Sequence, residues 1–421
     1  MNRVNNVPLD LAKDPMAKHV SALPATSGVI DNVTGRLRNR SRVQIHLDIA
    51  RANREAVRSM DSGAQPKAAL VELHCTDACD LDCTFCTYSD RNTESFPWKG
   101  IARIAALEPR AVVLAGGGEP TLYRDGQLRI SELIIELRRL LPQTHIGLIS
   151  NGALVPNAAA MAELSWVRVS MDASTEKAYN IIKRTSSPSY EKRLDNIANY
   201  MRSSIPDVGV GFVYNRSNLH QAADFVMEFF TITEGGRRQN GEFSLQFRPT
   251  CGIESCACPS PNYAPDTGRL MTPDKAPWWI EAREHQLKRV REMMAVNPQF
   301  ERFVNTFTNL LSGEFQRPIE QLGDFPSCYL ALVRLVIRAD GDMFPCVMTA
   351  SQRKRKIGNI LTSSGGEMLQ NMNSYYALRE GFCRGRRDCC NIDGVKNIYL
   401  EQADRCTDNT VLAPVGGDPF F

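Results

Sequence analysis

The feature that most constrains the fold is an alternation of short β-branched runs with longer helical patterns between residues 68 and 250. The runs that favour strands span residues 68–74, 111–115, 145–150, 166–171, 208–213 and 243–247. Apolar residues at helical spacing lie between them, over residues 130–141, 190–201 and 219–230. Strands that alternate with helices predict a parallel sheet. Six such units predict an α/β fold built on a partial (β/α)6 TIM-like barrel, rather than a closed barrel of eight strands.

Further segments flank this barrel on both sides. The arm before it is predicted to be helical over residues 41–60, and the segment after it over 278–311. Near the C-terminus, a hairpin is predicted from residues 332–338 through a turn at Asp340-Gly341 into 343–348. We therefore expect an N-terminal helical arm, the barrel, a Cys/Pro-rich loop with a helical connector, and a small C-terminal cysteine-rich α+β domain, at residues 1–66, 67–250, 251–325 and 326–421.

Charge and hydropathy exclude some classes of partner. Lys and Arg number 50 against 47 Asp and Glu, which leaves a net charge of +3. This balance predicts neither a nucleic-acid partner nor an anionic membrane partner. The N-terminus has no uninterrupted apolar run, and nowhere do about 18 apolar residues follow one another, so neither a secretory signal nor a membrane span is expected. We expect a cytoplasmic protein.

Cysteine is the informative residue type. A cytoplasmic chain keeps its thiols reduced, so the thirteen cysteines favour metal ligation or catalysis over disulfides. They fall into three groups: Cys75, Cys79, Cys83 and Cys86; Cys251, Cys256 and Cys258; and Cys328, Cys346, Cys383, Cys389, Cys390 and Cys406.

The loop after the first strand carries Cys79, Cys83 and Cys86. Three thiolates at this spacing can converge on one iron–sulfur cluster. Three ligands on a four-iron cluster leave one iron without a protein ligand, and an open site is typical of a catalytic metal. The alternative is a zinc loop in which Cys75 supplies a fourth ligand.

This CxxxCxxC motif, with the aromatic Phe85 before its last cysteine, resembles the signature of the radical S-adenosylmethionine (radical SAM) enzymes. In that family the open iron chelates the amino and carboxylate groups of S-adenosylmethionine. An electron from the cluster then breaks a carbon–sulfur bond to give a 5′-deoxyadenosyl radical. The resemblance implies S-adenosylmethionine as cosubstrate, a catalytic 4Fe-4S cluster, and an electron donor such as flavodoxin or ferredoxin.

Motifs at later strand ends extend the resemblance. Gly117, Gly118 and Glu119 are similar to the family's GGE motif, which receives the methionine ammonium group. Glycines there let the backbone approach a ligand closely. Asn151, in Ser-Asn-Gly, is similar to a segment near the methionine end of the cosubstrate.

The next two strands continue the pattern. Ser170 and Asp172 alternate onto one face, at the position that contacts the ribose hydroxyls in the family. Lys183 or Arg184 is a candidate for the methionine carboxylate, because a cation pairs with it. The strand that ends at Val213 resembles the family's stretch against adenine.

Cysteines near the C-terminus resemble the twitch or SPASM extensions of this superfamily, which bind auxiliary 4Fe-4S clusters. Cys328, Gly341 and Cys346 form a CX12GX4C pattern. The resemblance implies at least one auxiliary cluster, and we expect its ligands to be Cys328, Cys346, Cys383 and either Cys389 or Cys390. Glu380 and Asp393 stand where a full SPASM extension has cysteines, so a second auxiliary cluster is less expected.

Two residues after the sixth strand are candidates for contact with substrate. Cys251 could donate a hydrogen atom to a substrate radical and so invert a stereocentre, or it could ligate a cluster or pack in its loop. Arg248 is a candidate substrate contact at the same end of the barrel.

The resulting expectation is an enzyme of the oxidoreductase or lyase type. It would abstract a hydrogen atom from an unactivated carbon of a small polar natural-product precursor, such as a sugar or an aminocyclitol. The auxiliary cluster would assist an oxidation, dehydration or rearrangement. The alternatives are a maturase of a ribosomal peptide, a redox-neutral epimerase with Cys251 as donor, and a non-enzymatic zinc-binding interaction scaffold.

Overall fold

The computed structural model describes residues 40–59, 63–88, 94–186, 189–215, 217–236, 241–249, 277–311 and 327–377, together with residues 397, 400, 401 and 404. The candidate residues Cys251, Cys383, Cys389 and Cys390 lie outside the described residues. Within the described part, no helix is both long and apolar enough to cross a membrane.

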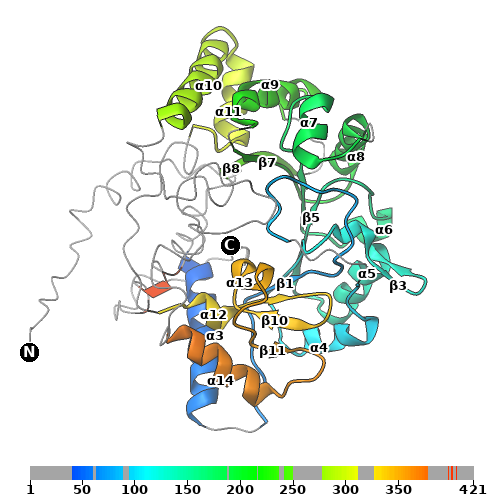
Figure 1. Cartoon of the computed structure of the whole chain (residues 1–421), viewed down its shortest axis with the longest axis vertical. Coiled ribbons are helices and arrows are strands. Elements are labelled where there is room, and N and C mark those ends of the chain that lie inside the picture. The colour runs from blue at the N-terminus through cyan, green and yellow to red at the C-terminus, as the bar shows by residue number, and fades with distance from the viewer. Residues whose placement is uncertain are drawn as a thin grey trace, which may run out of the picture.

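Among the described residues, nine strands form one central sheet, with the order β11-β10-β9-β1-β2-β5-β6-β7-β8 (Figure 1). Its strands are β1 (Leu70–Leu73), β2 (Ala111–Leu114), β5 (His145–Ser150), β6 (Trp166–Ser170), β7 (Asp207–Tyr214), β8 (Glu242–Pro249), β9 (Arg334–Ile337), β10 (Asp342–Phe344) and β11 (Gly358–Asn359). The run from β1 to β8 is parallel and follows chain order. These are the six strands expected from the sequence, so the prediction of a partial (β/α)6 barrel is confirmed.

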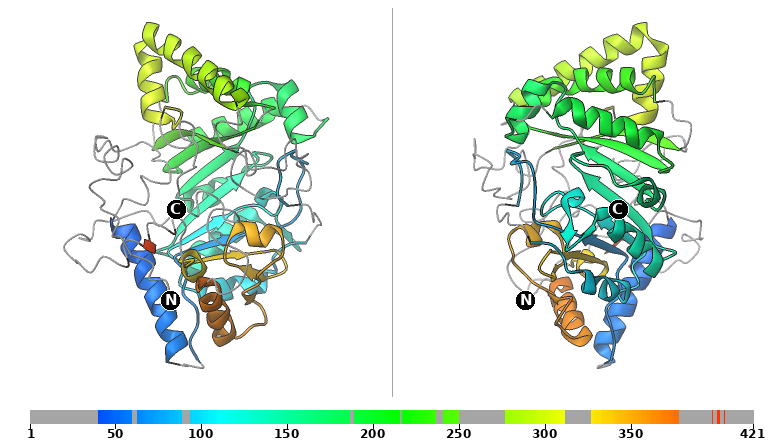
Figure 2. Two further views of the ribbon diagram at one scale, coloured as in Figure 1. Left: turned by 60° about the vertical axis from the view of Figure 1, so that its left-hand side comes forward. Right: turned by 90° about the vertical axis from the view of Figure 1, so that its right-hand side faces the viewer.

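Helices connect these strands and flank the sheet (Figure 2). In the barrel they are α4 (Ile101–Ala105), α5 (Ile130–Leu140), α6 (Ala158–Ala162), α7 (Glu176–Lys183), α8 (Tyr190–Arg202) and α9 (Ala222–Ile232). Short 3-10 turns are η1 (Trp98–Gly100), η2 (Pro120–Leu122) and η3 (Leu219–Gln221), and β3 (Arg124–Asp125) pairs with β4 (Leu128–Arg129). The connector contains α10 (Pro277–Val296) and α11 (Pro298–Phe307), which lie near α9 in Figure 1.

Apolar faces of these helices account for the core. On α5, Leu133, Ile134 and Leu137 are fully buried, at the spacing that sequence periodicity predicts for one helix face. Each such side chain contributes about 1.5–3 kcal/mol by leaving water. On the β8 side, Phe225 and Phe229 of α9 pack their rings against strand phenylalanines and each other. The barrel core therefore holds the strand ends in fixed positions.

The C-terminal hairpin joins the same sheet as the barrel. Its first strand, β9, pairs in parallel with β1, with Leu70 opposite Arg334 and Leu73 opposite Ile337. The sequence does not predict this pairing, because parallel partners so distant in the chain leave no local signal. The expected domain boundaries remain a prediction, although the segment after residue 326 shares its sheet with the barrel.

The expected hairpin is correct in its turn but wrong in its strand lengths. β9 begins only at Arg334, because Leu330–Val333 forms helix α12. β10 ends at Phe344, and Val347–Ser351 forms helix α13 instead of continuing the strand. Pro345 explains the second difference, because proline has no N–H to donate to a neighbouring strand.

Helix α3 (Arg40–Arg58) braces the C-terminal segment. It packs on α12 and on α14 (Gly365–Tyr376), and the three helices lie together in Figure 1. The buried Asn53 amide donates to the carbonyls of Leu332, at 2.7 Å, and Lys67, at 2.8 Å. The described part of the N-terminal arm is therefore fixed against the region that carries Cys328.

Candidate active site

The loop that follows β1 carries Cys79, Cys83 and Cys86, and all three side chains are partly exposed. Two main-chain hydrogen bonds attach this loop to the end of α7. Asp82 N donates to Lys183 O at 3.1 Å, and Thr84 N donates to Ile182 O at 2.9 Å. Within the described residues the three cysteines form no disulfide with one another. The loop carries three soft sulfur donors at one end of the barrel.

Cys75 differs from these three cysteines. It is fully buried in the main core, with its Sγ atom 3.9 Å from Pro120 O. Burial raises the pKa of the Cys75 thiol, and the nearby Glu119 carboxyl raises it further. Since metal ligation requires the thiolate, Cys75 fits a core residue better than a fourth ligand. Among the described residues, no three His, Cys, Asp or Glu side chains are grouped closely enough to hold a single metal ion.

The glycine loop after β2 is hydrogen-bonded to the cysteine loop. Gly118 N donates to Thr76 O at 2.9 Å, and Glu119 N donates to Ala78 O at 2.7 Å. A Cβ atom on Gly118 would lie 2.1 Å from Ala78 O, which is far inside van der Waals contact. Only glycine therefore allows this approach of two backbones.

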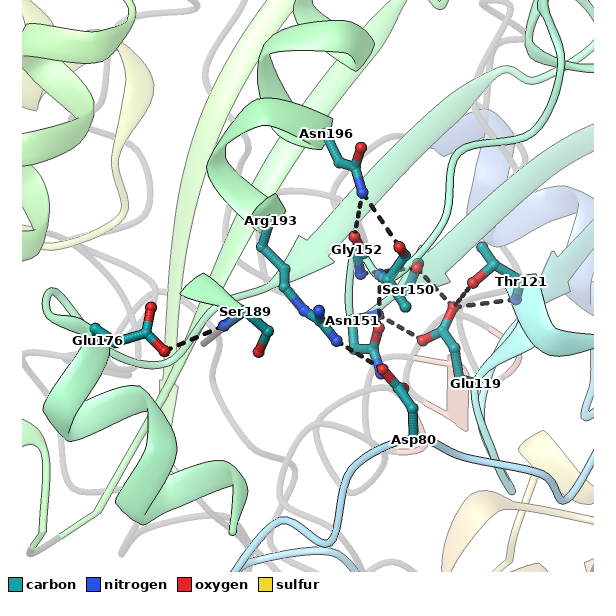
Figure 3. A network of polar contacts seen from close by, with 11 residues as sticks. Asp80, Glu119, Thr121, Ser150, Asn151, Gly152, Glu176, Ser189, Arg193 and Asn196 are labelled. Atoms are coloured by element: carbon teal, nitrogen blue, oxygen red, sulfur yellow. Dashed lines mark hydrogen bonds and ion pairs between the residues drawn. The ribbon is translucent and has the colours of Figure 1, made fainter. Parts of the chain in front are cut away.

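Glu119 joins this loop to the end of β5, as Figure 3 shows. Its buried carboxylate accepts from Thr121 N at 3.0 Å, Thr121 Oγ1 at 2.7 Å, Ser150 Oγ at 2.7 Å and Asn151 N at 2.6 Å. Burial raises the pKa of Glu119, although these hydrogen bonds act in the opposite direction. Both carboxylate oxygens are thus occupied in fixing the positions of Ser150 and Asn151.

Asp80 connects the cysteine loop to two further elements (Figure 3). It accepts from Asn151 Nδ2 at 2.6 Å and from Arg193 Nη2, on α8, at 2.7 Å. Arg193 is buried, and the start of its helix is fixed because Glu176 accepts from Ser189 N at 3.1 Å. Sequence reasoning missed both residues. The position of Asp80 between two motif cysteines could have indicated it, whereas nothing in the sequence distinguishes Arg193 from other helical arginines.

Four residues that the sequence predicted separately meet at the ends of β6 and β7. Asp172 is fully buried in a left-handed conformation, with φ of 63°. Its carboxylate accepts from Val213 N at 2.6 Å and forms an ion pair with Lys183. The Lys183 ammonium lies 5.4 Å from the ring centroid of Phe85, within the range of a cation–π contact.

The charge of Lys183 is favoured despite its burial. Desolvation alone would lower the pKa of Lys183, but Asp172 and the nearby Cys83 thiol raise it. Lys183 is therefore a buried cation next to the cysteine loop. Arg184, the alternative candidate, is exposed, and its Nη1 atom lies 3.5 Å from Asp82 Oδ2. Ser170 is half-buried at the end of β6.

Arg248 occupies the seventh position of the eight-residue strand β8 and is half-buried. It lies opposite Val213 in the parallel register of β7 and β8. This places it at the same edge of the sheet as the other candidates.

A second pair of cysteines lies in the C-terminal segment. Cys328 precedes α12, and Cys346 directly precedes α13. The strands β9 and β10 lie between the two cysteines along the chain. Both are partly exposed, and they form no disulfide with another described cysteine. Of the predicted auxiliary ligands, these are the ones within the described residues.

Buried contacts join the two cysteine-bearing segments. Arg338, just after β9, is fully buried with its Nη2 atom 3.2 Å from Asp77 Oδ2. Its guanidinium also lies 5.5 Å from the ring centroid of Tyr88. The Tyr88 hydroxyl in turn donates to Val347 O at 3.4 Å. The loop around Cys86 and the segment around Cys346 therefore pack directly on each other.

Two family models match this chain, and each covers one of the two cysteine-bearing segments. A model described as the radical SAM superfamily matches residues 73–226. A model described as the SPASM iron–sulfur cluster-binding domain matches residues 328–392. No match was found among curated proteins.

Solved structures with a related arrangement include three enzymes of low sequence identity. SuiB of Streptococcus suis, bound to its precursor peptide SuiA, is 15% identical with a TM-score of 0.46, over 77% of this chain and 69% of that one. Native anSMEcpe with AdoMet and the Cp18Cys peptide is 15% identical with a TM-score of 0.49, over 82% and 99%. BtrN in complex with AdoMet and 2-DOIA is 12% identical with a TM-score of 0.34, over 75% and 89%.

Proposed function

Because the chain belongs to the radical SAM superfamily and carries a SPASM iron–sulfur domain, we propose that it abstracts a hydrogen atom from an unactivated C–H bond of a small polar natural-product precursor, of the sugar or aminocyclitol type. Proteins with these two domains use S-adenosylmethionine, a catalytic 4Fe-4S cluster and auxiliary iron–sulfur clusters. The proposal is supported above all by one observation: the loops after β1, β2 and β5 are hydrogen-bonded to one another, and the first of them carries the three cysteines.

We assign Cys79, Cys83 and Cys86 as ligands of the catalytic cluster. Three partly exposed thiols on one loop suit a cluster that keeps one open iron. When bound, this cluster supplies the electron that converts S-adenosylmethionine into methionine and a 5′-deoxyadenosyl radical. The protein keeps the loop in place through Asp80, whose two oxygens are held by β5 and α8.

The residues around this loop are proposed to bind the cosubstrate. Gly117 and Gly118 bring main-chain groups close to the loop, while Glu119 orients Asn151 rather than remaining open to solvent. These main-chain groups would receive the methionine ammonium group. Lys183 provides a fixed positive charge next to the loop, suited to the methionine carboxylate.

The remaining cosubstrate contacts lie one or two strands away. Ser170 and Asp172 are proposed to face the ribose, with Asp172 held in position by Val213 N. Val213 and Phe85 are proposed to lie against adenine. Because Asp172 accepts from both Lys183 and Val213, a ribose hydroxyl would add a further donor to an already oriented carboxylate.

Substrate is proposed to enter near Arg248, at the β8 side of the same edge. Cys251, which lies outside the described residues, is proposed as a second substrate contact. A small substrate is favoured because the described part of the N-terminal arm, α3, is committed to bracing the C-terminal segment. The boundaries 1–66, 67–250, 251–325 and 326–421 are proposed as the domain division. A flavodoxin or ferredoxin is proposed as the electron donor.

An auxiliary 4Fe-4S cluster is proposed on Cys328, Cys346, Cys383 and either Cys389 or Cys390. It would assist the oxidation, dehydration or rearrangement that follows hydrogen abstraction. The segment that carries Cys328 and Cys346 packs against the cysteine loop through the contacts of Tyr88 with Val347 and Arg338. This packing favours an auxiliary cluster near the catalytic one.

The proposal is tested by anaerobic incubation of the reduced, reconstituted protein with S-adenosylmethionine and separated pools of small polar metabolites or peptides. We expect 5′-deoxyadenosine to form together with loss of one small metabolite. Cys83→Ala should abolish 5′-deoxyadenosine, whereas Cys75→Ala, at a buried core position outside the CxxxCxxC motif, should retain it. Absence of 5′-deoxyadenosine with every reductant would contradict the reaction. Consumption of a peptide alone would contradict the substrate class.

A further inference from the structure

The side chain of Asn397 lies against the sulfur of Cys328. Its Nδ2 atom is 3.7 Å from Cys328 Sγ, within hydrogen-bond distance for sulfur. Asn397 is fully buried. No motif in the sequence points to this residue, because it lies 69 positions from its partner.

The orientation of the amide is fixed by a second contact. Asn397 Oδ1 accepts from Leu330 N at 3.1 Å. A backbone N–H can only donate, so the amide atom that faces it must be the oxygen. The amide nitrogen, which can only donate, therefore faces the sulfur.

Neighbouring contacts hold the segment that carries Asn397. Residues 397, 400, 401 and 404 are helical, and their spacing places them on one helix face. Leu400 is fully buried, and Asp404 accepts from the Tyr329 hydroxyl at 2.7 Å. Asp404 also forms an ion pair with Arg51 of α3 at 2.8 Å. Contacts to Tyr329, Leu330 and Arg51 therefore fix this helix face next to Cys328.

A weaker contact of the same kind occurs at Cys346. The buried Thr349 hydroxyl lies 3.5 Å from Cys346 Sγ, but it also lies 2.9 Å from Cys346 O. Its single proton is thus divided between two acceptors, and the Asn397 amide provides the better-defined donor to sulfur.

A hydrogen bond to a cluster thiolate favours the reduced cluster, because reduction adds negative charge that the donor stabilises. We propose that Asn397 acts through Cys328 as a positioning residue that raises the reduction potential of the auxiliary cluster. The cluster then accepts an electron more readily, which suits the oxidation that the proposed function assigns to the auxiliary cluster. This inference rests on the proposed function, because it requires Cys328 to be a cluster ligand.

The test uses the full-length chain with Cys79, Cys83 and Cys86 replaced by alanine, so that the iron–sulfur signal comes from the auxiliary site. In this parent we compare Asn397→Leu and Asn397→Asp in an anaerobic redox titration followed by electron paramagnetic resonance. Asn371→Leu is the matched control, because the Asn371 amide donates to the carbonyl of Ile357, at 2.8 Å, and not to sulfur.

We expect Asn397→Leu to move the midpoint to a more negative potential. The oxidised-to-reduced ratio at a fixed potential should rise roughly tenfold, which is about 59 mV for a one-electron couple. Asn397→Asp should move the midpoint in the same direction, because an ionised carboxylate cannot donate. An exchangeable deuteron coupling of the reduced cluster in heavy water should disappear in both variants and persist in the control.

Each other outcome overturns the inference. An unchanged or more positive midpoint contradicts it directly, as does a shift of equal size in the Asn371→Leu control. Loss of the cluster in both Asn397 variants also contradicts it, because a residue that tunes a sulfur is not required for assembly. A parent without any iron–sulfur signal would instead refute Cys328 as a ligand, and with it the auxiliary part of the proposed function.

Discussion

Replacement of Arg338 by methionine tests how the C-terminal segment is joined to the cysteine loop. Arg338 and Asp77 form a fully buried ion pair at 3.2 Å, and Arg338 Nη1 also donates to Ala350 O at 3.0 Å. Methionine fills much of the same volume but leaves the Asp77 carboxylate without its buried counter-charge. Removal of one partner of such a pair costs about 3–5 kcal/mol. We therefore expect Arg338→Met to lower the free energy of unfolding by about that amount.

Urea unfolding of the reduced full-length chain, followed by circular dichroism, measures this effect. Arg353→Met is the control, because Arg353 is partly exposed and pairs with Asp340 on the surface of the same hairpin. An exposed pair contributes only about 0–1 kcal/mol. The double variant Asp77→Leu/Arg338→Met should recover part of the loss, because it removes both buried charges.

Equal losses in Arg338→Met and Arg353→Met would refute this reasoning. The same conclusion would follow if the double variant were as unstable as the sum of its single variants, because buried partners in contact should not behave independently.

Two further predictions follow from contacts in the barrel. Gly118→Ala should separate the glycine loop from the cysteine loop, because its Cβ would lie 2.1 Å from Ala78 O. The amount of iron bound after reconstitution should therefore fall. The control Gly366→Ala should bind iron normally, because the space around its Cβ is open. Burial raises the pKa of Glu228 to about 7, against a hydrogen bond from Tyr190 that lowers it. The folded protein therefore favours the protonated carboxyl, and this contribution to stability is complete below about pH 4.5 and is lost as pH rises through about 7. Melting temperatures at pH 5 and pH 8 should differ less in Glu228→Gln than in the unaltered protein, and an unchanged difference would contradict the assignment.

Local patterns in the sequence were sufficient for most of the barrel. The strand β5 has the bounds expected from residues 145–150, and α5 ends within one residue of its expected limit. The hairpin turn at Asp340-Gly341 was also correct, because Gly341 has the positive φ, 85°, that such a turn requires. These features depend on the periodicity of apolar side chains and on local backbone preferences, and both are set by residues that are adjacent in sequence.

The partners of the candidate site residues were not available from such patterns. The sequence placed Glu119 in a ligand motif, but its oxygens hold Ser150 and Asn151. It singled out Asp172 and Lys183 for different parts of the cosubstrate, whereas the fold pairs them with each other. A motif fixes which residue stands at a strand end, but not how its hydrogen-bonding capacity is divided among neighbours.

The sequence by itself determined the six strands of a parallel sheet, the three cysteines of one loop, and the presence of a second cysteine-rich segment. Only the tertiary structure decided that β9 pairs with β1, that Arg338 is buried against Asp77, and that Asn397 faces Cys328. The physical reason is separation along the chain: these contacts join residues more than 250 positions apart in the first two cases and 69 in the third. Such partners meet only when the whole chain is packed, so no local sequence pattern specifies them.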